Sequence, residues 1–118
     1  MIEPVVIQYL TENMDVPVLA EVPEVPSQEY PDFPEELIVI EKVGGSESNF
    51  LSRSDIAIQS YSTSLAGAAA LDEQMRQTMR GIVALPEIGG IRLSSNYNHT
   101  DVTTKRYRYQ SVYTITHY

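Results

Sequence analysis

The stretch from Ser54 to Leu85, SDIAIQSYSTSLAGAAALDEQMRQTMRGIVAL, decides the fold because a strand pattern runs directly into a long helical pattern. Up to Tyr61, one face carries Ile56, Ile58 and Ser60, and the other carries Asp55, Ala57, Gln59 and Tyr61. A period of two predicts a strand with one well-buried side. Ser62, Thr63 and Ser64 can then accept hydrogen bonds from the free N–H groups of a helix start.

The segment from Leu65 to Val83 has no proline, and its apolar residues recur at helical spacing. The apolar stripe is Ala68, Leu71, Met75, Met79, Ile82 and Val83. The side chains placed opposite are Asp72, Glu73, Arg76, Gln77 and Arg80. This pattern predicts an amphipathic helix that lies on a sheet and acts as scaffold, with no catalytic group.

Further elements follow from the same reasoning. The expected order is a short helix at Glu3–Asn13, an edge strand at Pro17–Val22, a proline-rich surface loop over about 23–35, and strands at Glu36–Val43, Ile91–Tyr97 and Lys105–His117. Strand Glu36–Val43 has an apolar centre that suggests burial on both faces, and Gly44-Gly45 is expected to end it. A polar loop, Ser46–Arg53, then completes a hairpin with a long tip.

Two antiparallel strand pairs therefore flank the long helix. We expect residues 1–118 to form a single α+β domain with two layers, in which a mainly antiparallel sheet has one long and one short helix packed on one face.

Charge is spread unevenly along the 118 residues, whose formal net charge is -8. The acidic residues 1–50 contain one base, Lys42, whereas residues 51–118 hold more bases than acids. Such a chain is repelled by nucleic acid overall. Its acidic and basic ends suit head-to-tail association of copies, although the acids may serve only to solvate a loop-rich segment.

Motifs for catalysis or cofactor binding are weak. His99-Thr100-Asp101 offers two metal ligands without a partner at metal-site spacing, so a polar turn is the better interpretation. Gly44-Gly45-Ser46 lacks the lysine and the helix of a phosphate loop. The chain has no cysteine, and its acidic first residues indicate no signal peptide. We therefore expect no cofactor, no metal, no enzymatic activity and no membrane association.

The last strand alternates tyrosine with cationic side chains. Tyr107, Tyr109, Tyr113 and Ile115 share one face, and Arg106 and Arg108 lie on the other. Such a pattern can stack bases and hold phosphates. The alternative, which the net charge favours, is a tyrosine face toward the core and an arginine face toward solvent or a neighbouring subunit.

Several segments resemble one known family. They are Ile38–Gly45, Asn49-Phe50, Ile56–Ser62, Leu93–Asn98, Asp101 and Tyr107–Gln110. On these residues the chain is similar to the tail terminator, or tail-completion, proteins of long-tailed bacteriophages, over most of its length in element order.

The resemblance implies a structural virion protein that caps the finished tail tube at its head-proximal end. It implies a hexameric ring of copies, with the tail tube protein and a head connector or neck protein as partners. It also implies a location in the virion, and in the host cytoplasm during assembly. Another neck protein, or a small ligand- or nucleic-acid-binding module, is the alternative. The residues expected to make protein contacts are Asn49, Phe50, Arg53, Asp101, Arg106 and Arg108.

Overall fold

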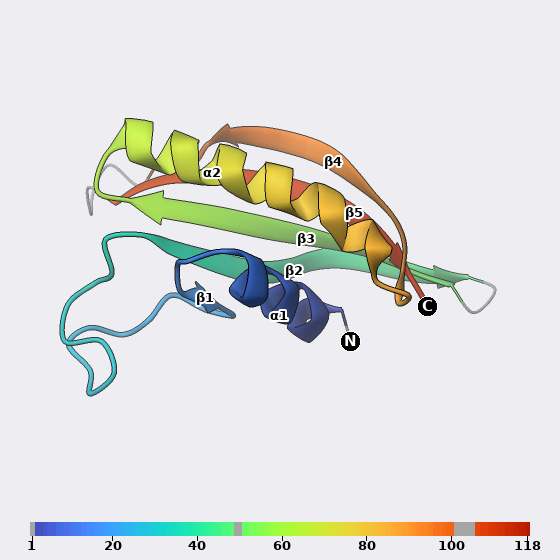
Figure 1. The fold of residues 1–118 in the computed structure, drawn as a ribbon, viewed down its shortest axis with the longest axis horizontal. Helices are drawn as coiled ribbons and strands as arrows, with labels where there is room; N and C mark the ends of the chain where they lie inside the picture. The colour runs from blue at the N-terminus through green and yellow to red at the C-terminus, as the bar shows by residue number, and fades with distance from the viewer. Residues whose placement is uncertain (1, 49–50, 101–105) are drawn as a thin grey trace.

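The computed structural model of the protein describes residues 2–48, 51–100 and 106–118. Its elements follow the predicted order (Figure 1). They are α1 (Glu3–Asn13), β1 (Val18–Leu19), β2 (Leu37–Ser48), β3 (Leu51–Ser62), α2 (Leu65–Met79), the 3₁₀ helix η1 (Arg80–Ala84), β4 (Ile88–Asn98) and β5 (Tyr107–His117). The bounds of α1 are those that the sequence predicts.

The strands form one sheet in the order β1-β2-β3-β5-β4. Neighbours are antiparallel except β1 and β2. The chain leaves β3, passes through α2, and enters the sheet again at β4, so that β5 later fits between these two strands. The sequence predicts the pair formed by β4 and β5 but not this insertion of β5.

Both helices cover the same face of the sheet (Figure 1). The core joins Val6 and Leu10 of α1, Met75 of α2, and Ile58 of β3 in one apolar cluster. This arrangement confirms the predicted α+β fold with two layers. Within the described ranges, no helix combines the length and the hydropathy needed to cross a membrane.

The β2–β3 hairpin differs from the prediction. Gly44-Gly45 does not end β2, because the ladder continues to the pairs Ser46↔Arg53 and Ser48↔Leu51. A bulge at Val43 shifts the register there. A β-carbon on Gly45 would lie 2.6 Å from the Arg53 carbonyl oxygen, so glycine permits close strand contact and does not act as a turn. The long polar tip predicted over Ser46–Arg53 is therefore wrong.

The end of the long helix is also corrected. The α-helix stops at Met79 and continues as η1, and Val83 is 50% exposed although the sequence places it in the apolar stripe. The tighter 3₁₀ turn changes the angular position of later residues, so Ile82 stays buried while Val83 faces away.

The proline-rich segment is a crossover. Because β1 and β2 are parallel neighbours, the chain must return along the sheet before it enters β2. Residues 20–36 make this return without helix or strand, as predicted. The edge strand is shorter than expected, since only Val18 and Leu19 pair with β2.

We expect Met75→Asp to unfold the domain, because residue 75 is fully buried in the helix–sheet core. An unpaired buried charge should cost several kcal/mol, on the order of the whole stability of a small domain. Gln74→Asp adds the same charge at an exposed position of the same helix and is the control. Urea unfolding of both variants tests the assignment, and a Met75→Asp variant as stable as the Gln74→Asp variant would contradict it.

Candidate protein-contact surface

The second face of the sheet is covered by no helix in the described part of the chain. Its side chains follow from the alternation of β3 and from the strand register. We call the part of this surface that lies on β3, β5 and β4 the open face; β2 contributes Leu37, Val39 and Glu41 to the same side of the sheet. The open face consists of Arg53, Asp55, Ala57, Gln59 and Tyr61 on β3, Arg108, Gln110, Val112, Thr114 and Thr116 on β5, and Arg92, Ser95 and Tyr97 on β4.

Hydrogen bonds order the polar side chains of the open face. In one row, the Tyr61 hydroxyl donates to Gln59 Oε1 at 3.2 Å, and Gln59 Nε2 donates to Gln110 Oε1 at 2.9 Å. Gln110 Nε2 then donates to the Tyr97 hydroxyl on β4. In a second row, Thr114 Oγ1 donates to Asp55 Oδ1 at 2.8 Å. These hydrogen bonds fix six side chains on three strands, of which Gln59 and Tyr61 are buried and Tyr97 is exposed.

Arg106 and Arg108 are engaged within the chain. The Arg106 guanidinium lies 3.9 Å from the ring centroid of Phe33, a residue of the proline-rich segment. Arg108 donates to the Tyr61 hydroxyl at 2.8 Å and to the His99 carbonyl oxygen. Phe33 and Tyr61 meet edge to face, with 5.8 Å between centroids. These contacts fasten the crossover to one end of the open face. A contact role for the two arginines toward a partner stays a prediction.

Two other arginines form a basic patch at the far end of the open face. Arg53 and Arg92 are exposed, and they line one depression of about 310 Å³ together with Gly90, Thr114 and Thr116. We call this the Arg53–Arg92 patch. Arg53 is one of the predicted contact residues, whereas Arg92 lies in a strand with no basic neighbour and gave no signal in the sequence. The other predicted contacts, Asn49, Phe50 and Asp101, lie outside the described residues.

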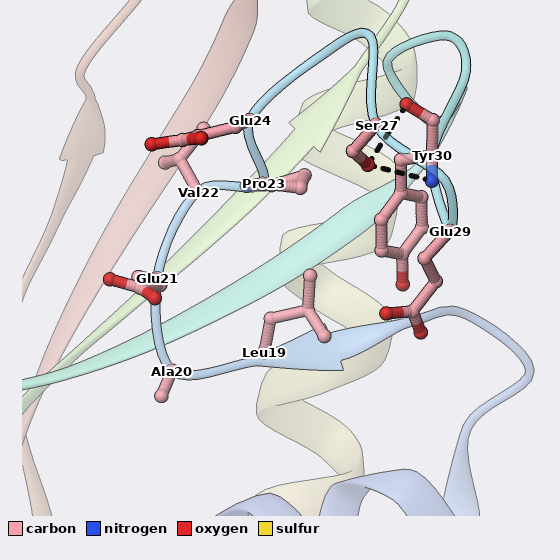
Figure 2. A pocket seen from close by; sticks show the side chains of 9 residues that line it. All are labelled: Leu19, Ala20, Glu21, Val22, Pro23, Glu24, Ser27, Glu29 and Tyr30. Carbon is pink, nitrogen blue, oxygen red and sulfur yellow. Dashed lines mark hydrogen bonds between the residues drawn. The ribbon is translucent and has the colours of Figure 1, made fainter.

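The proline-rich segment lines an open cavity of about 430 Å³ (Figure 2). Leu19, Pro23 and Tyr30 supply its apolar lining, and the two limbs of the segment form its sides. Ser27 accepts a hydrogen bond from the Tyr30 N–H at 2.9 Å, which fixes the turn between the limbs. The acids on the rim of this cavity are Glu21, Glu24 and Glu29, all exposed. We call this the acidic cavity.

Ser54 and His117 form a pair near the start of α1. The Ser54 hydroxyl lies 2.9 Å from His117 Nε2, and both line an open cavity of about 560 Å³. Ser54 is only 1% exposed and stands in the middle of a strand. No hydrogen bond joins His117 to a carboxylate in the described ranges, so the pair lacks the third group of a serine hydrolase. Burial, with a smaller effect of Lys42, lowers the pKa of His117 below its ordinary value of 6.5.

Asp72 is the largest departure from the predicted faces of α2. The sequence analysis places it on the polar side, but it is 1% exposed. Its carboxylate accepts hydrogen bonds from the Ser111 hydroxyl and from Asn96 Nδ2, both at 2.8 Å, and from Arg76 Nε at 2.9 Å. Its spacing indicates this burial, because residue 72 comes four positions after Ala68 and three before Met75 and so lies within the apolar stripe.

The tyrosine face of β5 points to the helix layer. This agrees with the interpretation in which the tyrosines face the core. Tyr113 pairs with Ile56 and Ile115 pairs with Ser54 across the ladder, and both side chains are buried. Burial raises the pKa of Tyr113 to about 12, against a smaller lowering by Arg76. The hydroxyl therefore stays protonated at any physiological pH.

Comparison with models of known protein families and with curated protein sequences finds no match, so the function of this chain has to be inferred from its surfaces. Among the described residues, no three side chains of the metal-ligating types gather in a group that could hold an ion.

We expect Asp72→Ala to lower the free energy of unfolding by roughly 2–4 kcal/mol, because the buried Ser111 hydroxyl loses its acceptor and Asn96 loses one of its two. Glu73→Ala, at the adjacent exposed position, is the control and should change the stability little. Chemical unfolding measures both, and equal stabilities would show that the carboxylate is not needed.

We expect His117 to make stability pH-dependent. Its pKa is lowered in the folded chain, so the unfolded chain binds the proton more readily, and stability falls as the pH drops below about 6.5. The parent should lose more stability than His117→Gln between about pH 7.5 and about pH 5. His99→Gln removes the exposed histidine and should keep the slope of the parent. Identical slopes for the parent and for His117→Gln would contradict this role.

Proposed function

We propose that this chain is a structural protein of a long-tailed bacteriophage. It caps the tail tube at the head-proximal end as a ring, stops tube polymerisation, and forms part of the head–tail junction. Its role is to bind proteins and not to catalyse a reaction. Its partners are further copies of itself, the tail tube protein and a connector or neck protein.

The resemblance to tail terminator proteins supports the proposal because the residues that carry it lie on the strands of the sheet. Ile38–Gly45, Ile56–Ser62, Leu93–Asn98 and Tyr107–Gln110 fall on the four long strands β2, β3, β4 and β5. The likeness therefore concerns the sheet, which presents the open face, and not the helices that close the core.

The ordered open face is the observation that carries the proposal. Side chains that are already fixed lose little conformational entropy when a partner covers them. The row from Tyr61 through Gln59 and Gln110 to Tyr97 is fixed in this way across three strands. Within this row Tyr61 and Gln59 are buried and hold Gln110, which in turn holds Tyr97, and the 41% exposed Tyr97 can exchange hydrogen bonds with a partner. A concave catalytic site would need a different shape.

A nucleic-acid-binding module is less well supported. Tyr113 is buried in the helix layer, while Arg106 and Arg108 bind groups of their own chain on the other side of the sheet. A platform built from the tyrosines and arginines of β5 would need both on one exposed surface, whereas the strand places them on opposite faces.

The test is electron microscopy of phage particles assembled without this protein. We expect tails of abnormal length that are not joined to heads, because nothing stops tube growth. Adding the purified chain should restore tails of normal length, and the Met75→Asp variant should not. Tails of normal length beside leaking heads would indicate another neck protein instead. Particles that assemble normally, with a small ligand that raises the Tm of the chain, would replace the proposal by a binding module.

A further inference from the structure

We propose that the Arg53–Arg92 patch of one copy binds the acidic cavity of the next copy, so that the chain associates head to tail. The inference rests on the proposed function in one respect, namely that the associated copies close into a ring. It adds the two surfaces that meet and the type of contact between them.

The basic surface is held in place by the sheet. Arg92 pairs with Thr114 and Arg53 pairs with Thr116, and these two threonines are two residues apart on the same face of β5. The backbone positions of both arginines are thus set by ladders, while their guanidinium groups stay exposed. Asp55 is the nearest acid on this face, and its Oδ1 already accepts a hydrogen bond from Thr114.

The acidic surface suits an incoming arginine in shape as well as charge. Leu19, Pro23 and Tyr30 offer apolar contacts for the methylene groups of the side chain and an aromatic ring for the guanidinium. Glu21, Glu24 and Glu29 on the rim supply the opposite charge. The Ser27–Tyr30 hydrogen bonds keep the cavity formed without a ligand.

The two surfaces cannot meet within one chain. The molecule is 44 Å long, and residues 20–36 lie at one end while β3 and β4 begin at the other (Figure 1). In the described part of the chain, Arg76–Asp72 is the ion pair found, and it involves neither surface. Both sets of charges are therefore free for a second copy. A contact between two different patches adds copies in one direction. It gives a closed ring when the rotation from one copy to the next divides a full turn evenly.

Reciprocal charge reversal tests the inference. Variant A carries Arg53→Glu and Arg92→Glu, and variant B carries Glu21→Lys, Glu24→Lys and Glu29→Lys. All five positions are exposed, so both variants should keep the Tm of the parent. By sedimentation at low ionic strength, the parent should associate, and A and B should each stay monomeric. An equal mixture of A and B should associate again, because each reversed patch then meets its complement.

Matched controls separate local charge from net charge. Arg80→Glu with Gln74→Glu and Gln77→Glu changes the net charge as variant A does, on the exposed side of α2 and at the start of η1. Glu12→Lys, Glu73→Lys and Glu87→Lys match variant B. Both control proteins should associate as the parent does. Association of the parent should weaken by at least about tenfold when salt is raised from ~50 to ~500 mM.

Several results would overturn the inference. The first is that variant A or variant B alone associates as strongly as the parent. The second is that the mixture of folded A and B does not associate. The third is that the parent stays monomeric at every concentration at low salt. If the lysine set of B lowers the Tm, the corresponding Glu→Gln set replaces it and should weaken association on its own. Its mixture with A should then stop at a 1:1 pair, because the intact patch of the Gln variant still meets the intact acidic cavity of A. A chain that associates in this way but leaves tail length unchanged would disprove the proposed function alone.

Discussion

The buried carboxylate of Asp72 is the interaction on which the arrangement of the layers depends. It binds donors from two strands, Ser111 of β5 and Asn96 of β4, and so connects α2 to both. An apolar stripe alone would let the helix slide or rotate on the sheet, since hydrophobic contacts are not directional. A buried charge with three donors is satisfied in one position of the helix, because any shift leaves polar groups unpaired. The helix layer is thereby fixed over β5 and β4.

The parallel pairing of β1 with β2 has a consequence on the open face. A parallel neighbour requires a long crossover, and here an irregular segment rich in proline and acids makes it. Phe33 anchors the crossover over Tyr61 and under Arg106, which covers one end of the open face and leaves Arg53 and Arg92 at the other end exposed. The same segment supplies the acidic cavity. One topological constraint thus separates the acidic end from the basic end and leaves a polar surface between them.

The sequence predicts those features that depend on periodicity. The bounds of α1, the core faces of β3 and β5, and the capping of α2, where Ser64 accepts from the Gly67 N–H at 2.9 Å, follow from local pattern. Features that depend on distant partners were missed. The insertion of β5 between β3 and β4, the extension of β2 beyond Gly45, and the burial of Asp72 are each decided by a strand far away in sequence. Of the two arginines in the Arg53–Arg92 patch, the sequence analysis names Arg53, whereas Arg92 joins it only through the register of β4 with β5.

The shape of the sheet edges bears on how copies can associate. A free edge strand is a template for pairing with another chain, and both long edges here carry irregularities that disfavour it. β2 has the bulge at Val43 between Lys42 and Gly44, and β4 has register shifts near Gly89 and Ser94. Bulges twist an edge away and interrupt its row of hydrogen-bonding groups. Edge-to-edge pairing would also continue without limit, as in a fibre. Contacts through the faces and ends of the molecule have no such template, so their geometry can set a fixed angle between copies. A closed ring needs that angle, and the bulged edges remove the pairing that would compete with it.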